Sequence, residues 1–466
     1  WLLMGLIGTA VGMLAFLIHQ IIDSLIELEW DLVENYLQSM GTDVVIYLST
    51  GQDGNIHMMW LCALGSAVAM VIFSSGSVLF FCPAGSPSGL PEIIGYLNGT
   101  SIQHLFNIKT FLGTFVSCML AVASGLFCRP EGPMIHALLG CGLSQLQLDN
   151  LGIHLPIFTR FRNSADKRSF ITAGAGAGIA SVFRAPVGGL LFTLEEVSSF
   201  WDIRLAWQTS FCCSMATFAT DLLSSSVYGF VYRGHFGFFE AEKRIIFWVK
   251  NLLDINILAF VPTVLLGTLG GLLGALFVSL NIKINKLRMQ FFNSIPKLSF
   301  RKTSKLLETV LILEVSCVPL VASLGSGRNF LAVGVGCILS FPCSSEQGSA
   351  AALLVENGKQ GITDLFKRGT HEEFGYTSLC TALAFYFILS CWTAGSAVAS
   401  GLVIPMLYTG ALYGGIIGLI LVSIFGVQTN EYGAWIDPGL FAAIGAASFF
   451  SGVSRLTISL TVTMVS

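Results

Sequence analysis

The chain has 466 residues, of which 54% are hydrophobic and only 11% are charged, whereas about 25% of a soluble globular domain is charged. A net charge of -3, with no basic cluster interleaved with aromatic residues, excludes a nucleic-acid-binding protein. We therefore expect an all-α polytopic membrane protein, whose apolar segments have room for about ten crossings of ~20 residues each.

In chain order, the apolar runs predict a series of helices. A long first helix covers residues 1–38, and a second covers 58–82. Further helices are expected up to residue 97 and at 111–128, 134–146, 171–182, 187–200, 205–227, 257–282, 306–324, 378–394, 403–425 and 438–450. The helices at 171–182 and 187–200 are each too short to cross a ~30 Å hydrocarbon core alone. We expect them to form a pair that enters the membrane and returns.

Two loops, at 160–168 and 283–305, hold most of the Lys and Arg residues. Because basic loops stay in the cytoplasm, both are predicted on that side of the membrane. Between the two loops lie a returning pair of helices and two full crossings. Because this is an even number of passages, both loops lie on the same side of the membrane, as this orientation requires. The polar stretch at 325–375 would then face the lumen or the outside.

The two ends of the sequence and the cysteines do not indicate a reactive or metal-binding site. Trp1 opens directly into an apolar run with no basic region before it, and Ser466 falls inside an apolar segment, so we interpret the chain as a fragment. The twelve cysteines are scattered, mostly in apolar runs, and most should be small buried hydrophobic residues. Cys337 and Cys343 are the one pair considered for a disulfide. No metal or other cofactor is expected.

Glycines spaced four residues apart mark faces where helices can pack closely in lipid. They include Gly270 and Gly274, and Gly410, Gly414 and Gly418. This spacing predicts helix packing rather than chemistry.

Three breaks in the apolar pattern share small residues and a proline just before an apolar run. They are GSPSGLPE at 85–92, RPEGP at 129–133 and SGLVIP at 400–405. Glycine lets the backbone approach a ligand, proline starts a helix, and the free N–H groups at a helix start attract anions. Broken helices at membrane depth are tolerated only inside protein or beside a cavity. The three breaks therefore predict one anion site built from backbone amides, weak enough for the ion to leave.

Glu131 lies in the second break. An intramembrane carboxylate is costly, which makes Glu131 a functional candidate. A helix N-terminus attracts either this carboxylate or a dissolved anion, so protonation would decide which of them occupies the site. The alternative is a Glu that caps a helix in a surface loop, and the pentapeptide alone does not choose between the two.

These motifs resemble the GSGIP, GKEGP and GxFxP signatures of the CLC chloride channel and transporter family. The stretch FRAPVGGLLFTLEE at 183–196 is similar to the most recognisable part of that family. Residues 132–136, 199–201 and 391–393 are most similar to its late endosomal and lysosomal branch. The resemblance covers essentially the whole chain.

The resemblance implies a CLC-type inverted repeat of tilted and broken helices in a homodimer. Its first half would span roughly residues 1–230, and its second half, which is truncated, would span 250–466. The family's coordinating tyrosine and its cytoplasmic CBS domains would lie beyond Ser466.

The resemblance also assigns roles by position. Glu131 matches the gating glutamate, whose side chain competes with chloride, and Glu196 matches the proton glutamate of the exchangers. Ser88 matches the serine that touches the central anion, which favours chloride over nitrate. The anion-binding positions implied are Ser88, Gly89, Leu90, Gly132, Pro133, Gly401, Leu402, Val403 and Ile404.

Three departures from the family pattern bear on selectivity and gating. Pro87 stands at the first glycine of GSGIP, which removes one N–H and fixes φ. Arg129 and Pro130 replace Gly-Lys before the gate. Val403 replaces the usual Phe, which should widen the pathway.

For several polar residues near these motifs, the sequence allows more than one role. Glu196 is either the proton carrier or an acid paired with a basic residue at the membrane surface. Glu195 beside it is expected to be structural. His136 is a proton relay or, by preference, a packed histidine. Arg184 either neutralises a carboxylate or closes a helix turn.

The function implied is a chloride/proton antiporter gated by a protonatable glutamate. The alternative is a passive voltage- or pH-gated chloride channel of the same fold. A third interpretation, an intramembrane hydrolase, lacks a base matched to the serine motifs, so no enzyme is expected. The expected partners are chloride, protons, membrane lipid and a second copy, with nitrate and an accessory subunit left open. The expected location is an endosomal, lysosomal or vacuolar membrane.

Overall fold

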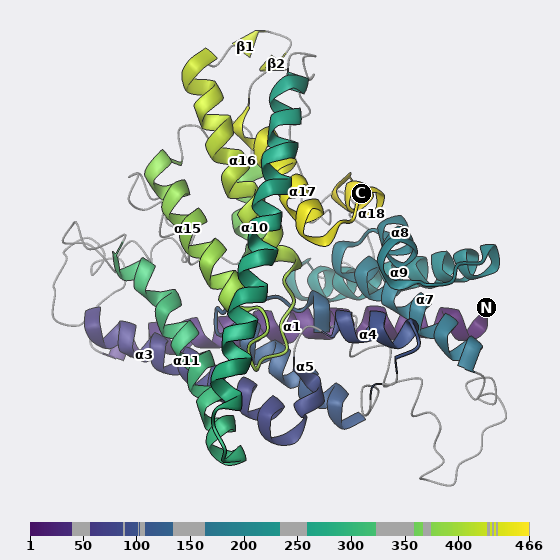
Figure 1. The fold of residues 1–466 in the computed structure, drawn as a ribbon, viewed down its shortest axis with the longest axis horizontal. Helices are drawn as coiled ribbons and strands as arrows, with labels where there is room; N and C mark the ends of the chain where they lie inside the picture. The colour runs from purple at the N-terminus through teal and green to yellow at the C-terminus, as the bar shows by residue number, and fades with distance from the viewer. Residues whose placement is uncertain are drawn as a thin grey trace.

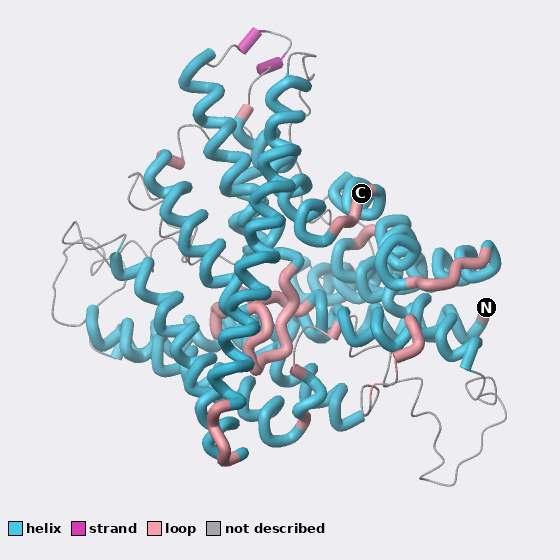
Figure 2. Tube along the Cα trace, viewed as in Figure 1, coloured by secondary structure: helices cyan, strands magenta, loops and turns pink. Residues whose placement is uncertain are grey.

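The computed structural model describes residues 1–39, 56–86, 89–100, 102, 108–133, 164–233, 259–322, 358–366, 374–425, 429–430, 433–434 and 437–465. These residues are helical apart from turns, connecting segments and two antiparallel two-residue strands, β1 (Thr429–Asn430) and β2 (Gly433–Ala434) (Figure 2). The expectation of an all-α fold with broken helices is confirmed.

The helices are labelled in Figure 1. They are α1 (Leu2–Ser39), α3 (Ile56–Gly76), α4 (Leu90–Leu97), α5 (Ile108–Ala123), α7 (Ser164–Phe183), α8 (Pro186–Phe192), α9 (Ile203–Arg233), α10 (Phe260–Asn293), α11 (Leu298–Ala322), α14 (Gly358–Phe366), α15 (Tyr376–Thr393), α16 (Val403–Phe425), α17 (Pro438–Ser454) and α18 (Ile458–Val465). Single turns follow α3 at Ser77–Phe81 and Pro83–Gly85, and η5 (Thr193–Val197) follows α8.

Five helical segments among the described residues are long and apolar enough to cross a membrane, judged by length and composition. They are Leu2–Glu29, Leu64–Phe81, Phe260–Asn293, Tyr376–Thr393 and Val403–Phe425. The apolar helices Lys109–Ala123 and Pro438–Ser454 are shorter. This mixture of long and short apolar helices is typical of a polytopic protein with broken spans.

Several helix bounds differ from those expected. Helix α7 begins at Ser164 and has 20 residues, so at about 1.5 Å per residue it is not too short to span a ~30 Å core. Helices α10 and α11 extend into the basic loop at 283–305, and α14 lies within the polar stretch at 325–375. In each case the helix continues through polar residues, because hydrogen bonding of the backbone does not require an apolar side chain. The helix expected at 134–146 lies outside the described residues.

The packing role expected for the spaced glycines is confirmed along α16 and α17. A Cβ placed on Gly410 would lie 2.6 Å from Cα of Ala446, and one on Gly418 would lie 2.7 Å from Cα of Pro438. Only hydrogen fits at these positions, so the two backbones approach closely. Gly274 of α10 packs in the same way against Gly452 of α17.

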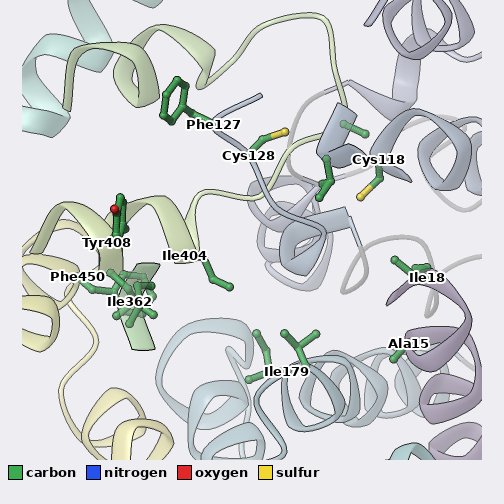
Figure 3. Packing of buried hydrophobic residues seen from close by; sticks show 14 of the residues in the cluster. Ala15, Ile18, Cys118, Phe127, Cys128, Ile179, Ile362, Ile404, Tyr408 and Phe450 are labelled. Atoms are coloured by element: carbon green, nitrogen blue, oxygen red, sulfur yellow. The ribbon is translucent and has the colours of Figure 1, made fainter. Parts of the chain in front are cut away.

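One hydrophobic core joins segments that are distant in the sequence. Figure 3 shows residues of α1, α5, α7, α14, α16 and α17 converging on it. Phe127, in the segment after α5, makes an edge-to-face contact with Tyr386 of α15, and Tyr386 makes another with Tyr408 of α16. The segment that holds Glu131 is thereby anchored to the C-terminal helices.

Candidate functional site

Glu131 is buried at the start of a helix. Helix α5 ends at Ala123, and Gly125 turns the chain with a positive φ of 78°. After this turn the chain reaches Pro130, and residues 131–133 are helical. Glu131 is fully buried, and Gly132 and Pro133 are buried beside it. A surface-loop cap is therefore wrong for Glu131.

The second and third breaks are joined by a β-bridge between Arg129 and Gly401. The Arg129 N–H donates to the Gly401 carbonyl at 3.0 Å, and the Gly401 N–H donates to the Arg129 carbonyl at 2.7 Å. A Cβ on Gly401 would lie 2.7 Å from the amide nitrogen of Gly132 and 3.3 Å from that of Glu131. Glycine is therefore required at 401, and its backbone lies directly against the amides of the helix that begins at Glu131.

Hydroxyl groups from the N-terminal half hold the loop that precedes Gly401. The Ser117 hydroxyl of α5 accepts a hydrogen bond from the Ala399 N–H at 3.2 Å and lies 3.0 Å from the hydroxyl of Ser74. The Ser86 hydroxyl, in the first break, donates to the Ser396 carbonyl at 3.4 Å. Ser86 of the first break thus contacts the loop that leads into the third break, which is bridged to the second break.

The first and third breaks each end in a helix start. Gly89 has a positive φ of 77° and precedes Leu90, the first residue of α4. Leu402 precedes α16, whose first turn contains Val403 and Ile404, and Ile404 is almost completely buried. Helix starts of this kind carry amides without intrahelical partners, which suits an anion. Pro87 and Ser88 lie outside the described residues, as does His136.

A cluster of side chains from α10, α11 and α15 holds the start of the loop that precedes Gly401. We call this cluster, formed by Arg288, Glu308 and Trp392, the α15 clamp. Arg288 pairs with Glu308 at 2.8 Å and donates to the carbonyls of Trp392 at 2.6 Å and Ala394 at 3.1 Å. The Trp392 indole N–H donates to Glu308 at 3.2 Å. The guanidinium therefore caps the C-terminal end of α15, where a cation is favourable.

Glu195 has the structural role that was expected of it. Its carboxylate accepts hydrogen bonds from the backbone amides of Ile458 and Ser459 at 3.0 and 3.1 Å and from the Thr457 hydroxyl at 3.0 Å. It thus caps the N-terminus of α18 from another element. Desolvation raises the pKa of Glu195, but the hydrogen bonds from Ser459, Ile458 and Thr457 outweigh it and lower the pKa to about 2.

Glu196 is half-buried in the same turn, η5, which lies outside the five candidate spans. Burial raises its pKa, and the negative charge of Glu195 raises it further. The turn packs against α4, and the Ser199 hydroxyl donates to the Leu97 carbonyl at 3.2 Å. Helix α4 therefore connects the surroundings of Glu196 at its C-terminal end with Gly89 at its N-terminal end.

Arg184 fulfils both of the roles that the sequence left open. It closes the turn between α7 and α8 with a positive φ of 55°, and its guanidinium lies 3.5 Å from the Asp221 carboxylate of α9.

Sequence reasoning missed Ser117 and the α15 clamp. The clamp residues come from three helices, and no local spacing connects them. A usable signal was the presence of Arg288 and Glu308 at the edges of apolar helices, where a charge needs a partner.

Comparisons with known proteins agree with this architecture. A family model described as "Voltage gated chloride channel" matches residues 65–466. The chain is 31% identical over 544 residues to "Chloride channel protein D" of Dictyostelium discoideum, covering all of this chain and 51% of that protein. It is 31% identical over 481 residues to "H(+)/Cl(-) exchange transporter 7" of Homo sapiens, covering all of this chain and 55% of that protein.

The chain thus spans about half the length of the curated relatives it matches. Among solved structures, that of a slow cyanobacterial Cl⁻/H⁺ antiporter is similar with a TM-score of 0.68 and 18% identity, over 99% of this chain and 87% of that one. The family model covers most of the sequence, so the chain belongs to the voltage-gated chloride channel family, the CLC family.

Proposed function

We propose that the protein is a chloride/proton antiporter, in which Glu131 is the gating glutamate and Glu196 the proton glutamate. The observation that carries this proposal is the burial of Glu131 at a helix start that is bridged to a second helix start through Arg129 and Gly401. A carboxylate there competes with a dissolved anion for the same backbone amides. The names of the relatives, an exchange transporter among them, support the same choice.

Transport would run as an alternation at this site. When Glu131 takes up a proton, its side chain loses its attraction for the amides and leaves, and chloride enters. When chloride moves on, Glu131 releases the proton and returns. The anion would be held by Ser88, Gly89 and Leu90 from the first break, together with the backbones of Gly132 and residues 401–404. Because these groups supply partial charges rather than a full cation, the ion can also leave.

Glu196 would pass protons between the cytosol and this site. Burial and the charge of Glu195 raise the pKa of Glu196, so this carboxyl holds a proton at higher pH than an ordinary Glu, which suits a proton carrier. The basic segments on α7 and on the α10–α11 connection would lie on the cytoplasmic side. We further propose a homodimer in an endosomal, lysosomal or vacuolar membrane, with repeat halves at roughly 1–230 and 250–466.

The test is a flux measurement on the full chain in liposomes with imposed chloride and pH gradients. An antiporter has a reversal potential that moves with both gradients, whereas a passive channel follows chloride alone. Glu131→Ala should leave anion flow and abolish proton coupling, and Glu196→Ala should stop proton movement while anions still pass. Full proton coupling in Glu131→Ala would contradict the assignment of the gate.

A further inference from the structure

Helices α10 and α11 are joined by a short turn (Figure 1), and the sequence on both sides of this turn is basic; we call it the basic hairpin. Residues 260–282 of α10 carry no charge and extend about 35 Å at 1.5 Å per residue, which is enough to cross a ~30 Å hydrocarbon core. From residue 283 to residue 305 the sequence contains seven cations and no acidic residue. These cations are Lys283, Lys286, Arg288, Lys297, Arg301, Lys302 and Lys305. The hairpin therefore begins at the depth where lipid headgroups lie.

A groove of about 450 Å³ opens between the two helices at this level. Its lining is mainly apolar and includes Leu287, Phe291, Leu307 and Leu311. All four of these side chains are exposed. Earlier on α10, the apolar side chains of Val261, Leu265, Leu269, Leu272 and Leu276 are exposed as well. A surface of this kind suits an acyl chain.

A lysine borders the same groove. The Lys305 ammonium lies 5.6 Å from the ring centroid of Phe292, which lines the groove. Lys302 lies on another face of α11, where its ammonium is 5.3 Å from the ring centroid of Phe80, a residue outside the groove lining. Lys305 therefore presents its charge at the edge of the apolar groove. Glu308, the acidic residue in the lining, is already paired with Arg288.

We propose that the α10–α11 groove is a docking site for an anionic phospholipid, with an acyl chain in the groove and the phosphate near Lys305. Charge complementarity favours this occupant over a zwitterionic lipid, because basic segments at the headgroup level attract anionic lipids. The α15 clamp lines the groove through Arg288, Glu308 and Trp392. A bound lipid therefore contacts the residues that hold the loop before Gly401.

The experiment uses the purified full chain in detergent micelles with added palmitoyl-oleoyl phosphatidylglycerol or phosphatidylcholine. Lipid retention is measured by native mass spectrometry, which requires no transport assay, so failure here is distinct from failure of the proposed antiport. Wild type should retain phosphatidylglycerol several-fold better than phosphatidylcholine. The variant Lys305→Gln should weaken this preference.

A matched control, Arg204→Gln, makes the same charge change on α9 and should keep the preference. Leu307→Trp fills the groove without changing the charge and should lower the retention of phosphatidylglycerol. If the lysine variant does not fold, the Leu307→Trp variant tests the proposal in its place. Equal retention of the two lipids by wild type would overturn the proposal. So would an equal loss of preference in the control, or unchanged retention in Leu307→Trp.

Discussion

Arg129 and Gly401 exchange two backbone hydrogen bonds, of 3.0 and 2.7 Å, and so fasten the approach to Glu131 onto the approach to α16. Neither residue contributes a side chain to this bridge. We therefore expect that adding a side-chain atom at a glycine of these loops disturbs the anion site more than removing any one side chain does.

Gly401→Ala should reduce anion flux at least tenfold. The new methyl group would lie 2.7 Å from both the Arg129 carbonyl oxygen and the Gly132 nitrogen, so the bridge must open. Overpacking of this kind costs about 1–3 kcal/mol. Gly415→Ala is the matched control, because its methyl group would meet only Leu379 Cδ1 at 3.9 Å. Liposome flux and detergent stability of both variants check the prediction, and equal flux in the two would contradict it.

The sequence predicts the loops and the buried acid of this site, but it does not predict the contacts that hold the loops in place. The three breaks could be predicted because glycine and proline act locally on the backbone. The buried position of Glu131 could be predicted because an acid in an apolar chain is costly. The contact of Ser117 with Ala399 and the α15 clamp depend on which helices become neighbours, and residue spacing does not encode that. The start of α7 at Ser164 could not be predicted from apolar runs, because the first turns of this helix are polar.

Arg288→Met should destabilise the protein by about 3 kcal/mol, because it leaves the largely buried Glu308 without its cation. The carbonyls of Trp392 and Ala394 also lose their donor. The loop before Gly401 should shift, and the ratio of chloride to nitrate flux should change with it.

Two further variants separate loss of charge from loss of position at the α15 clamp. Arg288→Met with Glu308→Gln removes the buried charge and should recover most of the stability, but not the wild-type flux ratio. Arg288→Lys keeps the charge without the forked donor and should recover the ratio only in part. A wild-type ratio in all three variants would show that the clamp does not position the loop.

The cap that Glu195 forms on α18 should have a defined dependence on pH. The pKa of its carboxyl falls from an ordinary 4.5 to about 2 in the folded protein. An acid with a lowered folded pKa contributes stability that is complete above about pH 4.5 and is lost as the pH falls toward 2. Glu195→Ala should cost about 1 kcal/mol, as for the loss of a helix cap. Thermal unfolding in detergent should show this difference at pH 7 and a smaller one near pH 3.

Glu195 should also set the pH at which Glu196 exchanges protons. Burial raises the pKa of Glu196, and the charge of Glu195 raises it further. Glu195→Gln removes the second effect and leaves the first, so the pKa of Glu196 should fall. If Glu196 loads protons for transport, the pH profile of proton flux should then move to lower pH, while chloride flux in the absence of a pH gradient changes less. The reference is Glu196→Gln, in which the proton flux should be lost at every pH. A shift to higher pH in Glu195→Gln would contradict the repulsion between the two carboxylates, and an unshifted profile would mean that proton entry does not depend on Glu196.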